Sequence, residues 1–177
     1  MRRFGLVPSC LWQDSEIKQF GVITTLTAVY LRSNHHSNMI HLYQLSPPYA
    51  AIDLGISIDE YNDALRNLIN VGYCEYDPLK CVVWVRSAML SDIGEEMAKN
   101  DKRVKGLQKY IKQIPESPLK DKFVAEFGRK YRLNYKPPCK PPYKQERREK
   151  IEASQETDHS KTPVLVIDNE NKANDIH

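Results

Sequence analysis

The sequence lacks the features that mark several large classes of protein. No apolar run approaches the ~18–20 residues that a membrane-spanning helix needs. There is no Gly-rich phosphate loop, no H-E-x-x-H helix and no nucleophile elbow. We therefore expect a protein that is not an enzyme, requires no cofactor and does not contact a membrane.

Cysteine is scarce and is not arranged as in a metal site. The four cysteines, Cys10, Cys74, Cys81 and Cys139, lack the spacing of zinc ligands. The chain begins Met1-Arg2-Arg3 without an apolar segment typical of export, so we expect reduced thiols and a cytoplasmic location. The pair His35-His36 has no cysteine or carboxylate cluster beside it, which favours a surface loop over a metal site.

Charge is unevenly distributed along the 177 residues. The net charge of +3 combines a near-neutral start, a basic middle and an acidic end. Residues 1–90 hold seven Lys/Arg and eight Asp/Glu, residues 91–150 seventeen and nine, and residues 151–177 two and six. This polarity indicates a nucleic-acid contact outside the first compact region.

The stretch from Ser57 to Arg86 predicts a capped amphipathic helix followed by a hairpin. Ser57 and Glu60 have the spacing of a capping box, and Gly72 suits the position that ends a helix. Between them, apolar residues recur at helical spacing. Two β-prone runs, Tyr73–Tyr76 and Cys81–Arg86, then flank a turn at 77–80. With a short helix over 48–54 before it, this order is typical of a winged helix-turn-helix.

Further elements are predicted on both sides of this stretch. We expect a helix over Lys18–Ser33, because sixteen residues without a turn signal are long for a strand. Met39–Leu45 is β-prone and is a candidate third strand, and Ser91–Lys99 is a weak helix. Trp12 and Trp84 are expected to anchor the core.

Two better helices follow. Val104, Leu107, Ile111 and Ile114 form a narrow apolar seam, and Ser117 with Pro118 begins a second helix whose apolar face runs to Tyr131. The pair forms a helical hairpin, packed either on itself or on the winged helix.

The fold class expected is therefore α+β. We predict a winged-helix DNA-binding domain over 1–90, a helical extension over 91–133, and a basic Pro-rich arm with an acidic disordered tail over 134–177.

An ordered series of segments carries a resemblance to a known family. The chain resembles the N-terminal winged-helix domain of phage replication initiation proteins of the replisome-organiser type. The resemblance covers roughly residues 4–133, and the segments that carry it are Leu11–Asp14, Ser33–Asn38, Ile40–Leu45, Pro47–Gly72, Val82–Arg86 and Asn100–Tyr131, with Val104, Gly106, Lys109, Pro115 and Ser117-Pro118-Leu119 in the last.

The resemblance implies a function in DNA replication. Such proteins bind origin DNA and help to deliver the replicative helicase or its loader, so these are the partners expected here, in the host cytoplasm if the gene belongs to a phage. A winged-helix transcriptional regulator and a protein-interaction module are the alternatives. The sequence indicates no coiled coil, and leaves the oligomeric state open.

The helix over 58–71 would be the recognition helix, with the turn at 77–80 as the wing. Asn pairs bidentately with adenine and Arg with guanine, which makes side chains of the exposed face candidate base readers. Carboxylates in its first turn favour instead a structural or protein-contact role, because they repel phosphates. The candidate DNA-binding residues here are Asn62, Arg66, Asn67, Asn70 and Lys80.

A basic arm over 129–150 is the second candidate DNA contact. Its cations stand among Tyr131, Tyr135 and Tyr143, whose rings can stack on unpaired bases, so single-stranded DNA is a possible partner besides duplex DNA. A solvated charge run is the alternative interpretation. The candidate residues are Arg129, Lys130, Arg132, Lys136, Lys140, Lys144, Arg147 and Arg148.

An apolar island interrupts the acidic tail. Four consecutive aliphatic residues are too few to build a core, so the island either docks on the protein's own sheet or adds a strand to a partner. We favour the partner, a helicase or its loader. The residues of this partner-binding island are Val164, Leu165, Val166 and Ile167.

Overall fold

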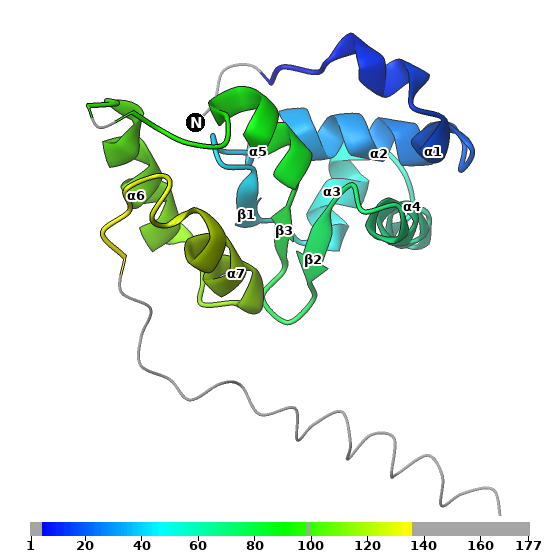
Figure 1. Cartoon of the computed structure of the whole chain (residues 1–177). Helices are drawn as coiled ribbons and strands as arrows, with labels where there is room; N and C mark the ends of the chain where they lie inside the picture. The colour runs from blue at the N-terminus through cyan, green and yellow to red at the C-terminus, as the bar shows by residue number, and fades with distance from the viewer. Residues whose placement is uncertain (1–4, 99, 136–177) are drawn as a thin grey trace, which may run out of the picture. The chain divides into compact units, whose positions relative to one another are not determined.

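The computed structural model describes residues 5–98 and 100–135. This part of the chain is α+β, with seven α-helices and a three-stranded antiparallel sheet (Figure 1). The elements in order are a 3-10 helix η1 (Ser9–Gln13), α1 (Ser15–Lys18), α2 (Val22–Ser33), β1 (Leu42–Gln44), α3 (Pro47–Leu54), α4 (Ile58–Asn70), β2 (Glu75–Asp77), β3 (Val82–Trp84), α5 (Arg86–Ile93), α6 (Arg103–Gln113) and α7 (Pro118–Phe127).

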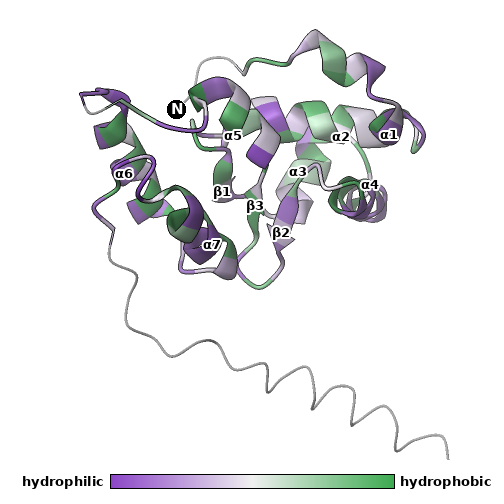
Figure 2. Cartoon of the chain, viewed as in Figure 1, coloured by the Kyte–Doolittle hydropathy of each residue, from purple (hydrophilic) through white to green (hydrophobic). Residues whose placement is uncertain are grey.

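The sheet has the order β1-β3-β2, with β3 in the centre. Trp84 faces Leu42 of β1 on one side and Glu75 of β2 on the other. The candidate third strand over Met39–Leu45 is confirmed in its centre, and β1 is its hydrogen-bonded part. Figure 2 shows hydrophobic residues along β3, as expected for a central strand that is covered by helices.

Side chains of β3 alternate between two hydrophobic cores. Val83 joins a first core, to which α2, α3 and α4 contribute, whereas Val82 and Trp84 join a second core, to which α5, α6 and α7 contribute. Because successive residues of a strand point to opposite faces, the two cores lie on opposite sides of the sheet. The predicted helical hairpin, α6 and α7, therefore packs on the sheet. Of the two arrangements considered from the sequence, packing on itself or on the winged helix, the structure has the second.

The joint between α3 and α4 follows local sequence signals closely. Gly55 ends α3 in the left-handed conformation (φ 68°), and Ser57 begins α4. The backbone N–H of Glu60 donates to Ser57 Oγ at 3.2 Å, and the backbone N–H of Ser57 donates to Glu60 Oε2 at 2.8 Å. These reciprocal bonds form the predicted capping box.

The C-terminal end of α4 is also as predicted. Gly72 has a φ of 71°, and its N–H donates to the carbonyl of Ile69 while that of Tyr73 donates to the carbonyl of Leu68. This pair of bonds is a Schellman motif, in which glycine carries the left-handed residue without a steric cost. The order helix, turn, helix and hairpin is compatible with a winged helix-turn-helix.

The second core is built around aromatic side chains. Trp84 meets Phe123 and Phe127 edge to face, at ring-centroid distances of 5.9 and 6.2 Å, and Tyr131 stacks on Phe127 at 5.1 Å. Ser117 caps α7 as predicted, by accepting from the N–H of Lys120. These contacts fix α7 on the sheet and, through it, the position of the chain segment that follows.

Three expectations about elements need correction. The helix predicted over Ser91–Lys99 lies earlier, over Arg86–Ile93, because Gly94 has a φ of 92° that ends it. The helix predicted over Lys18–Ser33 begins later, at Val22, because Gly21 (φ 89°) precedes it as the N-cap. The strand predicted over Cys81–Arg86 is confined to β3.

The two tryptophans have different environments. Trp84 is fully buried, as predicted, whereas Trp12 is 54% exposed, so its role as a core anchor was wrong. Trp12 lies in η1, where its neighbour Leu11 makes the contact with the first core instead. The predicted disordered tail over 134–177 lies, from residue 136 on, outside the described residues.

Candidate nucleic-acid interface

The outward face of α4 carries four of the candidate DNA-binding residues. Leu65 and Leu68 hold the opposite face against the first core. Asn62 and Asn67 are half-buried, and Arg66 and Asn70 are exposed. The helix therefore presents amide and guanidinium groups to solvent from a fixed backbone.

Carboxylates occupy the N-terminal half of the same face. Asp59, Glu60 and Asp63 are all exposed. The backbone N–H of Ser57, and secondarily its hydroxyl, donate to Glu60 and lower the pKa of its carboxyl group, which is therefore ionised at neutral pH. The helix thus has a negative half, up to Asp63, and a second half without carboxylates, from Ala64 on.

Arg66 is held by one weak interaction. Its Nη1 lies 3.0 Å from Oδ1 of Asp63, and both side chains are 68% exposed. Ion pairs with this exposure contribute about 0–1 kcal/mol, so another anion can replace Asp63 at little cost.

Lys80 lies at the tip of the hairpin between β2 and β3. Asp77 Oδ1 accepts from the N–H of Leu79 at 3.0 Å, and Gln44 Nε2 donates to the carbonyl of Lys80 at 3.1 Å. These bonds fix the turn while its side chains at 78–80 remain exposed. The ammonium group of Lys80 has no ion-pair partner among the described residues.

The first three cations of the predicted arm lie away from α4. Arg129, Lys130 and Arg132 are exposed and surround Tyr131, which is buried in the second core. Lys130 Nζ lies 5.5 Å from the ring centre of Phe127, and Arg132 Nε donates to the carbonyl of Met97 at 3.4 Å. These cations therefore belong to the layer on the α7 side of the sheet, not to that of α4.

The remaining candidates lie outside the described residues. They are Lys136, Lys140, Lys144, Arg147, Arg148, Val164, Leu165, Val166 and Ile167.

Sequence reasoning missed a row of cations on α6. Lys102, Lys105, Lys109 and Lys112 are all exposed. Each stands two residues before a member of the apolar seam, which places it about 200° away around the helix. The sequence contains the pattern that predicts this row, since the lysines and the apolar residues are both separated by three, four and three positions.

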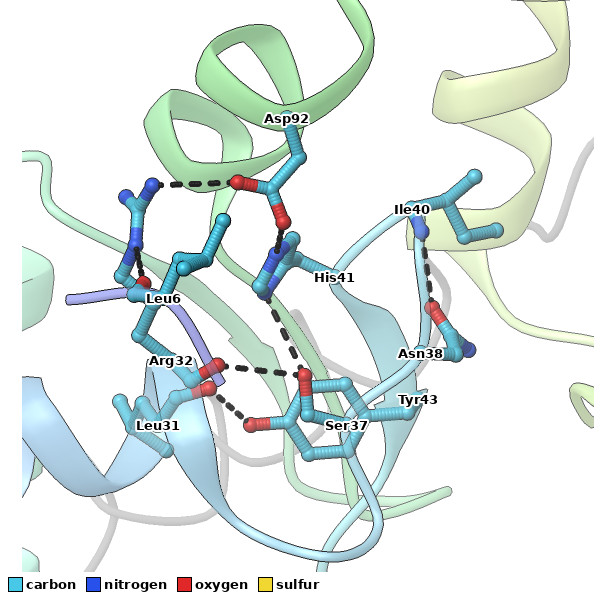
Figure 3. Close-up of polar contacts among 9 residues, drawn as sticks. All are labelled: Leu6, Leu31, Arg32, Ser37, Asn38, Ile40, His41, Tyr43 and Asp92. Atoms are coloured by element: carbon cyan, nitrogen blue, oxygen red, sulfur yellow. Dashed lines mark hydrogen bonds and ion pairs between the residues drawn. The ribbon is translucent and has the colours of Figure 1, made fainter. Parts of the chain in front are cut away.

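A buried polar cluster ties together three segments near the start of β1 (Figure 3). Asp92 of α5 accepts from Arg32 at 3.4 Å and lies 3.0 Å from Nε2 of His41. Ser37 Oγ lies 3.4 Å from Nδ1 of His41, and Arg32 Nε donates to the carbonyl of Leu6 at 2.6 Å.

The cluster is not an active site that a substrate can reach. Ser37 is 4% exposed and His41 is fully buried, so a serine, a histidine and an aspartate in line present no accessible nucleophile. Its hydrogen bonds instead join the N-terminal segment, the end of α2 and α5.

The exposed histidine pair has its own neighbours. The rings of His35 and His36 lie 3.8 Å apart, and His35 Nδ1 is 3.8 Å from Asp53 Oδ2. Partial burial, and secondarily the charge of His35, lower the pKa of His36. Within residues 5–98 and 100–135, no group of three or more His, Cys, Asp or Glu side chains is placed to hold a metal ion.

None of the helices in the described part of the chain combines the length and hydrophobicity needed to cross a bilayer. Comparisons of the chain with models of known protein families, with curated proteins and with solved structures find no match.

Proposed function

We propose that this chain is a winged-helix DNA-binding protein of the phage replication-initiation type. It would bind origin DNA in the host cytoplasm and help to recruit the replicative helicase or its loader. The observation that carries the DNA-binding part is the joint of α3 and α4, which holds a capped, polar-faced helix directly before the hairpin of β2 and β3. The replication role rests on the resemblance of residues 4–133.

In this proposal α4 reads bases with the amide and guanidinium groups from Asn62 to Asn70. Arg66 suits the O6 and N7 acceptors of guanine, and the three asparagines suit adenine. The carboxylates at the start of α4 repel phosphates, so the N-terminal turn stays away from the strands. Lys80 of the hairpin supplies a phosphate contact beside the base readers.

A salt titration of duplex binding tests the proposal. If cations neutralise phosphates, the logarithm of the affinity falls linearly with the logarithm of the salt concentration, by about 0.9 per phosphate contact. The titration uses the full chain and duplexes with and without a preferred sequence selected from a random pool. Binding that is absent at low salt, or insensitive to salt, would overturn the proposal.

A second function is favoured by a separate observation. Tyr49 and Ile52, which share one face of α3, are 66% and 74% exposed, close in sequence to the acidic start of α4. Contiguous exposed apolar surface with a polar rim marks protein-contact sites. In that case α3 and α4 would form a protein-interaction module.

One triple variant separates the two functions. Replacement of Asn62, Arg66 and Asn67 by alanine relaxes sequence preference if α4 reads bases. An unchanged preference would favour the protein-interaction module. A role in transcription instead of replication is distinguished by the neighbouring genes, among which a helicase or helicase-loader gene supports replication.

A further inference from the structure

The outward face of α6 is a continuous cationic surface. The four lysines at positions 102, 105, 109 and 112 span eleven residues, starting from the N-cap of α6, or about 15 Å at the rise of an α-helix. The helix contains no acidic residue, and none of these lysines has an ion-pair partner among the described residues. We call this row the α6 lysine stripe.

A hollow adjoins the N-terminal end of the stripe. It has a volume of about 560 Å³ and is lined by three cations and three amides: Lys102, Lys105, Arg132, Asn100, Gln108 and Asn134. Amide and cationic groups are the donors that bind phosphate oxygens. The positive end of the α6 dipole lies at the same place.

The one carboxylate at the hollow is already neutralised. Asp101 accepts from Nε and Nη2 of Arg103, at 3.0 and 2.7 Å, and these bonds lower the pKa of its carboxyl group. The hollow therefore keeps a net positive character although Asp101 lines it.

The stripe and α4 lie on opposite sides of the sheet. Leu107 and Ile111 pack α6 into the second core, whereas α4 belongs to the first core. Layers of secondary structure pack about 10 Å apart, so the sheet and two layers of side chains separate the two helices. A straight duplex that lies along α4 therefore faces the side of the sheet opposite to the stripe.

We propose that the α6 lysine stripe and the adjoining hollow form a second, sequence-independent DNA surface. It holds phosphates of a DNA segment other than the one that α4 contacts, so that one chain joins two segments. This inference deepens the proposed function, and it rests on that function for the identity of the ligand, which is DNA.

The test compares two fourfold variants of the full chain on a short duplex of arbitrary sequence. In one, the four lysines are replaced by glutamine, and in the matched control they are replaced by arginine. The quantity compared is the slope of the logarithm of the affinity against the logarithm of the salt concentration. Each phosphate contact contributes about 0.9 to this slope, so we expect the slope of the glutamine variant to be smaller by about 3 to 4. The arginine variant keeps it. An equal slope in wild type and the glutamine variant would overturn the proposal.

A separate variant tests the hollow without changing α6. Arg132 has a φ of 54°, a conformation that asparagine tolerates, so Arg132→Asn removes the charge with little strain. We expect a slope smaller by about 1. Because Arg132 Nε also donates to the carbonyl of Met97 at 3.4 Å, we expect a small decrease in the melting temperature. An unchanged slope would show that the hollow is not part of the DNA-binding surface. Polyglutamate serves as a polyanion without bases or phosphates. If the protein binds it with the same salt dependence as it binds DNA, the assignment of the surface to nucleic acid is overturned.

The outcomes separate this inference from the proposed function. If the glutamine variant loses slope but the triple alanine variant of α4 keeps its sequence preference, the stripe stands and the role of α4 fails. If the reverse holds, α4 stands and the stripe fails. Wild-type protein that binds no duplex at low salt overturns both.

A sandwich assay tests the joining of two segments. A preferred duplex is immobilised, the protein is added, and a labelled duplex of arbitrary sequence is then captured. We expect capture by the wild type and the arginine variant, and its loss in the glutamine variant. Equal capture by all three would contradict the second surface.

Discussion

Helices α4 and α6 have the same amphipathic construction and opposite electrostatic character. Each packs an apolar seam into a core and turns a polar face to solvent. On α4 that face combines three carboxylates with one arginine and amides, whereas on α6 it holds lysines and no acidic residue. In the proposed function this difference would divide the labour, with α6 supplying salt-dependent affinity and α4 supplying discrimination between bases.

The largest effect is expected from Trp84, the residue of β3 that joins α7 to the sheet in the second core. Trp84→Ala removes the side chain on which Phe123 and Phe127 pack, and we expect a loss of about 3–5 kcal/mol in the free energy of unfolding. Denaturant titration measures it, with Leu68→Ala in the first core as a comparison. Hydrogen exchange then shows whether α6 and α7 lose protection before α4, as two separate cores predict. Equal loss in both layers would contradict that separation.

The next effect sharpens the role assigned to α4. Arg66→Ala should weaken binding to a preferred duplex by about 1–3 kcal/mol and hardly change binding to an arbitrary one. Asp63→Ala is the matched control, because it frees Arg66 from its only ion pair in the described residues and removes a carboxylate. We expect it to strengthen binding. Equal losses on both duplexes for Arg66→Ala would make it a phosphate contact only.

A smaller effect concerns the start of α4. Ser57→Ala removes the acceptor of the Glu60 N–H, and the loss of such a cap costs about 1 kcal/mol. Thermal unfolding measures the change. Ser91→Ala is the control, since Ser91 is exposed and its side chain has no hydrogen-bond partner among residues 5–98 and 100–135. A Ser57→Ala protein as stable as the control would show that the cap does not hold α4 in place.

The smallest effect is a dependence of stability on pH. The pKa of Glu60 lies below its ordinary value of 4.5, because the folded chain hydrogen-bonds its ionised form. Its contribution is therefore present above pH 4.5 and is lost as the pH falls through the lowered value. Glu60→Gln should reduce the loss of stability on acidification in that range. It should leave the pH dependence of the free energy of unfolding near neutral pH unchanged. Unfolding curves at several pH values measure this, and identical acid profiles would contradict it.

Local signals made the α3–α4 joint predictable. A serine and a glutamate three residues apart, and a glycine at the end of α4, act within one turn of helix and need no tertiary contact. The apolar seams of α6 and α7 were readable for the same reason. The placement of α5 was missed, because the sequence around Gly94 does not reveal where the preceding strand ends.

Contacts between distant residues were not predictable. The sequence shows neither that Asp92 meets His41 and Arg32, nor that the α6–α7 layer covers the second face of the sheet, because these pairings depend on the finished fold. In contrast, the α6 lysine stripe was available from spacing alone. A charge count over 91–150 does not reveal it, because the count adds the lysines of α6 to the cations after residue 129.

The measurement that tests this division of labour most directly is an NMR titration of the full chain with two short duplexes. With a duplex of arbitrary sequence, we expect shifts at Lys102, Lys105, Lys109 and Lys112 and none in the side-chain amides of Asn62 and Asn67. With a preferred duplex, those amides and the Nε of Arg66 should shift as well. Shifts on α4 with both duplexes and none on α6 would contradict the account.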